Sequence, residues 1–242
     1  MLRTKLKQVL WTALLLCAPQ LFAAPYAQAR IIPAQDPLAL YGKEIAFDVF
    51  REGERVGRHT VAFTRTSPRD LSVIARLELE ITFLTIPFYK FLYRSSSVWR
   101  DERLQTLDAQ IDDDGEIATV RAFTKGLGLT VSGPNGQIEW RDVLYPTNHW
   151  NAGVLSQSRV LNTLNGDISQ VQIAATGRER IRAQGTWVQA TRYQYSGDID
   201  TTVWYDDAGR WVKMRFTAKG GSVIEYRCTR CGLDTANNAA TD

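Results

Sequence analysis

The sequence predicts a single all-β domain, mostly antiparallel, whose curved meander sheet forms a barrel or half-barrel with one short helix. Three observations predict it: apolar and polar residues alternate with a period of two, turn signals recur at strand-length intervals, and one segment alone shows helical periodicity. These signals indicate about a dozen strands, and a flat sheet of that width would expose apolar area and strand edges. The sheet is therefore expected to curl or close.

The N-terminal half shows the alternation most clearly. The segment Leu71–Phe83 places seven apolar side chains on one face and mostly polar side chains on the other, which is the pattern of a strand with one buried face. Before it, residues 43–51 and 55–65 alternate in the same way on either side of the turn sequence EGERVG. We therefore expect a hairpin followed by a long, half-buried strand.

Turn signals divide the rest of the chain into segments of strand length. They are Asp114-Gly115, Pro134-Asn135-Gly136, Asn165-Gly166, Ala208-Gly209 and Gly220-Gly221. Between Gly153 and Leu164 the apolar residues are spaced as in a short amphipathic helix. This is the one helix that the sequence predicts.

The first 29 residues are typical of a signal peptide. They contain three cations, a short apolar run and the small residues Ala27 and Ala29, which predict cleavage before Arg30. A lipid anchor is not expected, because Leu16 stands before Cys17 where lipid attachment needs a small residue. The predicted organisation is a signal peptide over 1–29, an N-terminal arm over 30–40, an antiparallel β domain over 41–233 and a disordered tail over 234–242.

The processed chain is electrically balanced. Removing residues 1–29 removes three of the 29 Lys and Arg residues and none of the 26 Asp and Glu residues, which leaves 26 (29 − 3) against 26. The formal charge of +3 thus belongs to the signal peptide, and charge gives no support for a nucleic-acid partner. No later apolar run is long enough to span a membrane. We expect a soluble protein in the periplasm or secreted beyond it.

Four stretches resemble a known family of short exported bacterial proteins. They read LTIPFYKF, TNHWN, WYDDAGRWVKMRF and GSVIEY. As a set they are similar to the domain of unknown function 6134, with the similarity running from about Tyr41 to Tyr226. The resemblance implies export and a mostly β fold, and it implies no particular chemistry. The chain departs from the family pattern in WRDERL, where a glycine is expected, and in its CTRC ending.

The segment YPTNHWN, Tyr145–Asn151, carries one of the two histidines of the chain. His149 could act as a general base if a neighbouring Asn oriented its ring, and a hydrolase acting on envelope material is the alternative function that this allows. The sequence has no nucleophile elbow and no carboxylate that can be assigned to His149. We therefore expect the segment to be a loop in which Trp150 turns inward as a plug and the polar neighbours satisfy its backbone.

Six tryptophans follow the signal peptide, each on or beside a predicted strand. An interior lined in this way is either a filled core or a pocket for an acyl chain or other apolar ligand. The predicted function is non-enzymatic binding of an apolar or lipid-like ligand, or envelope maintenance, by analogy with open β-barrels that carry lipids or lipoproteins. The candidate ligand-binding residues are Trp99, His149, Trp150, Asn151 and Trp204. No cofactor is predicted.

The motif CTRC holds both cysteines of the processed chain, Cys228 and Cys231. In an oxidising compartment these thiols are expected to form a local disulfide. A bridge needs Cα atoms within about 7 Å, whereas three extended residues span roughly 10 Å. The strand through Tyr226 is therefore predicted to stop by about Arg227.

The spacing of possible ligands predicts no metal site. Cys228 and Cys231 could join His59 and His149 in a Cys2His2 set, but the second closely spaced pair that such sites use is missing. The acidic segment IDDDGE, residues 111–116, lacks the first and last ligands of a calcium loop. It is better explained as a hairpin turn.

Overall fold

The computed structural model describes residues 36–83, 86–126, 128–218 and 220–233. The predicted signal peptide, the tail that was expected to be disordered and all but the last residues of the predicted arm lie outside the described residues. The elements are α1 (Pro37–Tyr41), β1 (Glu44–Arg51), β2 (Glu54–Arg65), β3 (Asp70–Phe83), β4 (Ile86–Arg100), β5 (Arg103–Asp113), β6 (Glu116–Lys125), β7 (Gly128–Gly133), β8 (Gly136–Trp140), β9 (Tyr145–Pro146), a 3-10 helix η1 (Ala152–Ser156), β10 (Arg159–Leu161), β11 (Ile168–Ala183), β12 (Thr186–Gly197), β13 (Thr201–Asp206), β14 (Trp211–Thr217) and β15 (Val223–Arg230).

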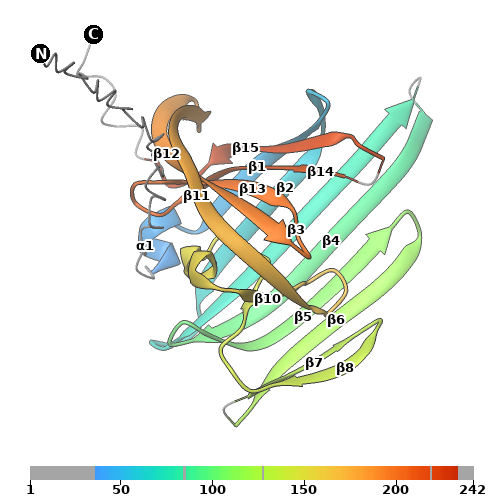
Figure 1. Cartoon of the computed structure of the whole chain (residues 1–242), viewed down its shortest axis with the longest axis vertical. Coiled ribbons are helices and arrows are strands. Elements are labelled where there is room, and N and C mark those ends of the chain that lie inside the picture. The colour runs from blue at the N-terminus through green and yellow to red at the C-terminus, as the bar shows by residue number, and fades with distance from the viewer. Residues whose placement is uncertain (1–35, 84–85, 127, 219, 234–242) are drawn as a thin grey trace, which may run out of the picture.

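The strands form one 15-stranded sheet, in the order β8-β7-β6-β5-β4-β3-β2-β1-β15-β14-β13-β12-β11-β10-β9. Every pair is antiparallel except β9 with β10. The chain thus builds two meanders that meet where β1 pairs with β15. Figure 1 shows β2 to β8 as one broad layer, with β11 to β14 crossing in front of it. The predicted fold class, a mostly antiparallel, curved β sheet, is confirmed.

The strand order itself explains why the sheet curls. A flat sheet of this many strands would be roughly 65 Å wide, because neighbouring strands lie about 4.8 Å apart. Its two edge strands, β8 and β9, are consecutive in the chain and are joined only by residues 141–144. A connection of that length spans at most roughly 17 Å. The sheet must therefore wrap round until its edges approach each other, which produces an open barrel with a seam.

Side chains and loops close the seam that strand pairing leaves open. The turn after β7 packs on the loop before β11 so closely that a Cβ atom on Gly133 would lie 2.4 Å from the carbonyl oxygen of Asn165. At the same end, Asn135 Nδ2 donates to Asp167 at 3.1 Å. At the other end, the Arg159 guanidinium lies 5.5 Å from the Trp140 ring centroid. A side chain at position 133 would force this end of the seam apart.

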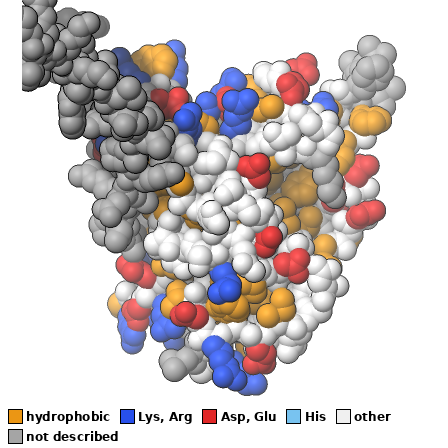
Figure 2. All heavy atoms as spheres, viewed as in Figure 1, with side chains coloured by type: hydrophobic (Ala, Val, Ile, Leu, Met, Phe, Trp, Pro, Cys, Tyr) orange, Lys and Arg blue, Asp and Glu red, His pale blue; other side chains and the backbone are white. Residues whose placement is uncertain are grey.

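The core lies inside the curled sheet. Alternate residues of β3, which include Leu71, Val73 and Ala75, are buried as the sequence predicts. The largest fully buried side chains are mainly aromatic and come from both meanders: Phe47 from β1, Tyr193 and Tyr195 from β12, Tyr205 from β13 and Trp211 from β14. On the face in view in Figure 2, Lys and Arg side chains are interspersed with Asp and Glu.

Two local predictions are wrong. The helix expected from Gly153 to Leu164 is only the single 3-10 turn η1, and the chain then extends as β10, because Val160 and Leu161 pair with both β9 and β11. The strand expected to stop by Arg227 continues to Arg230. The structure also contains one helical turn that was not predicted, α1, which begins with Asp36 as N-cap and a proline in its first turn.

Candidate functional site

The segment Tyr145–Asn151 closes one end of the barrel, and two tyrosine hydroxyls hold its backbone. Tyr41 Oη donates to the carbonyl oxygen of Trp150 at 3.0 Å, and Tyr205 Oη donates to that of His149 at 2.7 Å. Tyr41 Oη also accepts from the backbone N–H of Trp211 at 2.9 Å. Burial raises the pKa of both tyrosines further above its usual value, so both hydroxyls stay protonated. The loop is thereby tied to α1, β13 and β14.

Trp150 points inward, as the sequence predicts, and is 4 % exposed. Its ring meets Trp99 of β4 edge-on with centroids 5.1 Å apart, and Phe63 of β2 in the same way at 5.4 Å. Trp99 also donates from Nε1 to Ser97 Oγ at 3.0 Å, so its polar atom is satisfied. The Trp150 side chain therefore packs the loop against β2 and β4 on the inside of the sheet.

His149 is buried among aromatic rings. Its ring centroid lies 5.5 Å from that of Tyr195 and 5.5 Å from that of Trp211. The other histidine of the chain, His59 on β2, also contacts Trp211, with ring centroids 5.6 Å apart, and its second neighbour is Tyr226 at 5.5 Å. The two histidines, far apart in sequence, thus share one aromatic cluster around Trp211.

Several buried polar atoms of this interior have no hydrogen-bond partner among the described residues. They are both ring nitrogens of His59, Nδ1 of His149, Nε1 of Trp150, Oδ1 of Asn148 and the hydroxyl of Tyr195. Leaving such a group unsatisfied costs roughly 1–3 kcal/mol, so unsatisfied groups are uncommon in native interiors. Their concentration in one place marks the interior of the barrel as the candidate site.

Burial also sets the charge of the two imidazoles. Desolvation lowers the pKa of His59 to about 3, with a smaller contribution from His149. It lowers the pKa of His149 to about 4. Both rings are therefore neutral at pH 7, and each has one N–H donor and one acceptor nitrogen.

The structure brings some of the predicted ligand-binding residues together and not others. Trp99, His149 and Trp150 face the interior. Asn151 instead caps η1, where its Oδ1 accepts from the backbone N–H of Gly153 at 2.9 Å. Trp204 lies between the inward-facing Val203 and Tyr205, so alternation places it on the other face of the sheet. There its Nε1 donates to Glu179 Oε1 at 2.8 Å.

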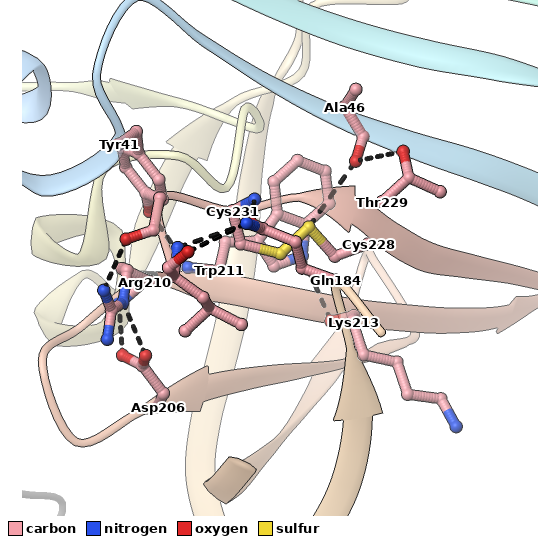
Figure 3. The surroundings of a disulfide bond; sticks show 12 residues. Tyr41, Ala46, Gln184, Asp206, Arg210, Trp211, Lys213, Cys228, Thr229 and Cys231 are labelled. Atoms are coloured by element: carbon pink, nitrogen blue, oxygen red, sulfur yellow. Dashed lines mark hydrogen bonds and ion pairs between the residues drawn. A yellow bond between two sulfur atoms is a disulfide. The ribbon is translucent and has the colours of Figure 1, made fainter. Parts of the chain in front are cut away.

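Cys228 and Cys231 form a disulfide, as predicted, with Cα atoms 6.2 Å apart. The strand can include Cys228 because β15 carries a bulge: Phe47 and Ala46 are consecutive on β1, whereas their partners Cys228 and Arg230 are two residues apart. The bulge shortens the path that a regular strand would take. Figure 3 shows Gln184, from the β11–β12 turn, next to the disulfide, where its Oε1 accepts from the backbone N–H of Cys231 at 2.6 Å.

Replacing both cysteines by serine is expected to lower the free energy of unfolding by about 1–2 kcal/mol, because so short a loop restricts the unfolded chain only slightly. Chemical denaturation of the oxidised protein and of the Cys228→Ser, Cys231→Ser variant measures this directly. Two titratable thiols in the non-reduced protein would contradict the bridge, and loss of the fold in the variant would contradict its small contribution.

Other site types receive no support from the part of the chain that the structure describes. In that part, no three His, Cys, Asp or Glu side chains are grouped so that they could hold a metal ion. Within the same ranges, the helices are all too short or too polar to cross a bilayer.

Sequence reasoning missed the residues that complete the interior: His59, Tyr41, Tyr195, Tyr205 and Trp211. A signal for His59 was present, because it shares the period-two face of Val61 and Phe63 on β2. The tyrosine hydroxyl contacts could not be found in the same way, since Tyr41 and Trp150 are separated by 109 residues.

The fold and the interior define a class of protein, a β-barrel-like domain with an aromatic interior closed by a loop. This chain belongs to the family described as Domain of unknown function (DUF6134), whose model matches residues 47–229. The match confirms the resemblance seen in the sequence. The fold is also similar to a crystal structure described as a "Beta-barrel-like Protein of Domain of Unknown Function DUF1849 from Brucella abortus", with a TM-score of 0.57 and 9% sequence identity, over 81% of this chain and 99% of that one. No curated protein matches the sequence significantly.

Proposed function

We propose that the protein is an exported, non-enzymatic binding protein for an apolar or lipid-like ligand, and that it acts in the periplasm or beyond it in the upkeep of the envelope. The observation that carries this proposal is the set of unpartnered polar atoms on an otherwise aromatic interior. An amphipathic ligand would complement both features, because its polar group would bond to the free imidazole and hydroxyl atoms while its apolar part packed on the rings.

The environment of His149 favours binding over hydrolysis. A general base needs an orienting group and a substrate proton within hydrogen-bond reach. Among the described residues, Nδ1 of His149 has no such partner, and the nearby Tyr195 hydroxyl is itself unpartnered. The ring of His149 contacts aromatic rings, and burial lowers the pKa of His149 to about 4, which makes the imidazole a weak base.

The loop Tyr145–Asn151 is the gate in this proposal. Trp150 and η1 close the end of the barrel, while β9 contributes only two paired residues to the sheet. Binding often resides on loops that a rigid scaffold positions. The loop is held by hydrogen bonds from Tyr41 and Tyr205, by the packing of Trp150 and by the short pairing of β9 with β10, so its opening would not break a long strand ladder.

Native mass spectrometry of the protein purified from the periplasm tests the proposal. We expect an adduct that dissociates on activation and that extraction identifies as a lipid or another apolar molecule. The Trp187→Ala variant, which changes an exposed Trp on β12, is the matched control and should keep the adduct. Protein that carries no adduct, and that takes up none from an envelope lipid extract, would contradict it.

Export makes its own prediction. The exported protein is expected to begin within a few residues of Arg30, because Ala27 and Ala29 provide the small residues of a cleavage site. The intact mass of the protein isolated from the periplasm measures this. A retained Met1, or a lipid adduct on Cys17, would contradict it.

A further inference from the structure

The surroundings of His59 and His149 are electrically neutral. Both rings contact Trp211, with centroids 5.6 and 5.5 Å from its own. Burial lowers the pKa of each imidazole, and no Lys, Arg, Asp or Glu of the described residues contributes to either value. Asp206 is the one residue of these four types that is buried in the described ranges, and its carboxylate already accepts from Arg210 at 2.6 Å. A charged ligand group placed beside the imidazoles would therefore lack a counter-ion, which is costly in a buried site.

The unpartnered atoms of the interior include hydrogen-bond acceptors as well as donors. Among them are both ring nitrogens of His59, Nδ1 of His149 and the hydroxyl of Tyr195, none of which has a partner among the described residues. The neutral ring of His59 has one N–H donor and one acceptor nitrogen. A carboxylate only accepts, so it leaves the acceptor nitrogen unsatisfied, whereas an ammonium only donates, so it leaves the N–H unsatisfied. A hydroxyl group donates and accepts, and it therefore suits both kinds of atom.

Half-buried apolar side chains continue the inner face of the sheet beside His59. Leu77 lies directly opposite His59, and Leu79, two residues further along β3, lies opposite Phe91 on β4. The three apolar side chains pack against the core and keep part of their surface exposed. The next side chain in the row of Phe91 is Asp113, an anion. Apolar surface next to His59 is thus available to an alkyl chain, while Asp113 disfavours a ligand with a negative charge.

We infer that the ligand of the aromatic interior is an uncharged amphiphile whose polar end carries a hydroxyl group, such as a long-chain alcohol or a monoacylglycerol. Its hydroxyl group bonds to His59, and its chain lies on Leu77, Leu79 and Phe91. This class of ligand rests on the proposed function, because it occupies the same site. Fatty-acid anions and anionic phospholipids do not fit, since their charge would have no counter-ion there.

Isothermal titration calorimetry at pH 8, on the processed protein freed of bound lipid, compares four ten-carbon probes that differ only at the polar end. They are decan-1-ol, decanoate, decylammonium and 1-methoxydecane. We expect decan-1-ol to bind at least about tenfold more tightly than each of the others, the scale of one unsatisfied buried polar group. 1-Methoxydecane controls for simple partitioning, because it is more apolar than the alcohol and accepts hydrogen bonds but cannot donate one.

Three variants make the test specific. His59→Phe should remove the preference for the alcohol over the ether, because the phenyl ring keeps the aromatic packing and has no polar atoms. His59→Gln should retain the preference in part, since its amide offers a donor and an acceptor. Leu92→Ala is the matched control for the chain site: Leu92 is half-buried on the outer face of β4, next to Phe91, so its loss should leave the binding of all four probes unchanged.

The outcomes separate this ligand class from the proposed function. Decanoate, decylammonium or 1-methoxydecane binding as tightly as decan-1-ol would overturn the hydroxyl ligand and leave an apolar-binding function standing. An unchanged preference in His59→Phe, shown to be folded by circular dichroism, would overturn it as well. So would a failure of decan-1-ol to bind, and the proposed function falls with it only if the protein also takes up nothing from an envelope lipid extract.

Discussion

Replacing Trp150 with alanine is expected to lower the free energy of unfolding by roughly 3 kcal/mol, the scale for removing a buried aromatic side chain. The expected loss follows from the burial of the indole, which is 4 % exposed, and from its edge-on contacts with Trp99 and Phe63. The same change should weaken retention of the bound ligand, because the loop then lacks the side chain that closes the barrel. Denaturant unfolding and native mass spectrometry measure the two effects.

Two variants serve as comparisons for Trp150→Ala. Trp187→Ala should change stability by no more than about 0.5 kcal/mol, because Trp187 is 55 % exposed. His149→Ala should be milder than Trp150→Ala in stability and in ligand retention, since its ring is smaller and makes no partnered hydrogen bond through Nδ1. If His149→Ala instead abolished an activity and left the melting temperature unchanged, the binding function would be wrong and the hydrolase would replace it.

Acidification between pH 6.5 and about 4 is expected to destabilise the protein through its two buried imidazoles. Their folded-state pKa values, about 3 for His59 and about 4 for His149, lie below the usual value of 6.5. In this window the unfolded state therefore binds more protons than the folded state, so the free energy of unfolding falls as the pH falls. The loss is on the order of 3 kcal/mol per imidazole at the acid end of the window, at about 1.4 kcal/mol per pKa unit.

The slope of stability against pH measures this effect separately from any packing change. Near pH 5 the two imidazoles should be protonated in the unfolded state and neutral in the folded state, so unfolding should take up nearly two protons. His59→Gln and His149→Gln should each reduce that difference to about one, whatever each substitution does to stability at pH 7. A flat profile between pH 6.5 and 5, or an unchanged slope in both variants, would contradict the burial of neutral imidazoles.

Period-two alternation carried most of the fold prediction, since it depends only on which residues face a core. It located β1, β2 and β3, and it could have identified His59 as an inward-facing residue. It failed between Gly153 and Leu164, where the apolar spacing fits a helix. There the pairing of Val160 and Leu161 with strands on both sides outweighs the local preference.

The candidate site was predictable only in part, because it depends on contacts across the barrel. Trp150 could be expected to turn inward from its position in a loop rich in Pro and Asn. The anchoring of that loop by Tyr41 and Tyr205 is set by the curl of the sheet, which brings together segments more than 50 residues apart. Alternation in the sequence puts Trp204 and Tyr205 on opposite faces of β13 but does not show which face points inward, because each face carries an aromatic residue.

Nitrogen-15 NMR of protein labelled only at histidine tests the binding of a ligand in the aromatic interior most directly, because the chain contains just two histidines. Spectra of the protein as purified and after removal of bound lipid should differ in the ring-nitrogen shifts of His59 or His149. Both nitrogens of His59 and Nδ1 of His149 have no partner among the described residues, and in this account they bond to the ligand. Adding the extracted ligand back should restore the first spectrum. Ring-nitrogen shifts that stay the same in all three samples would contradict a ligand at this site.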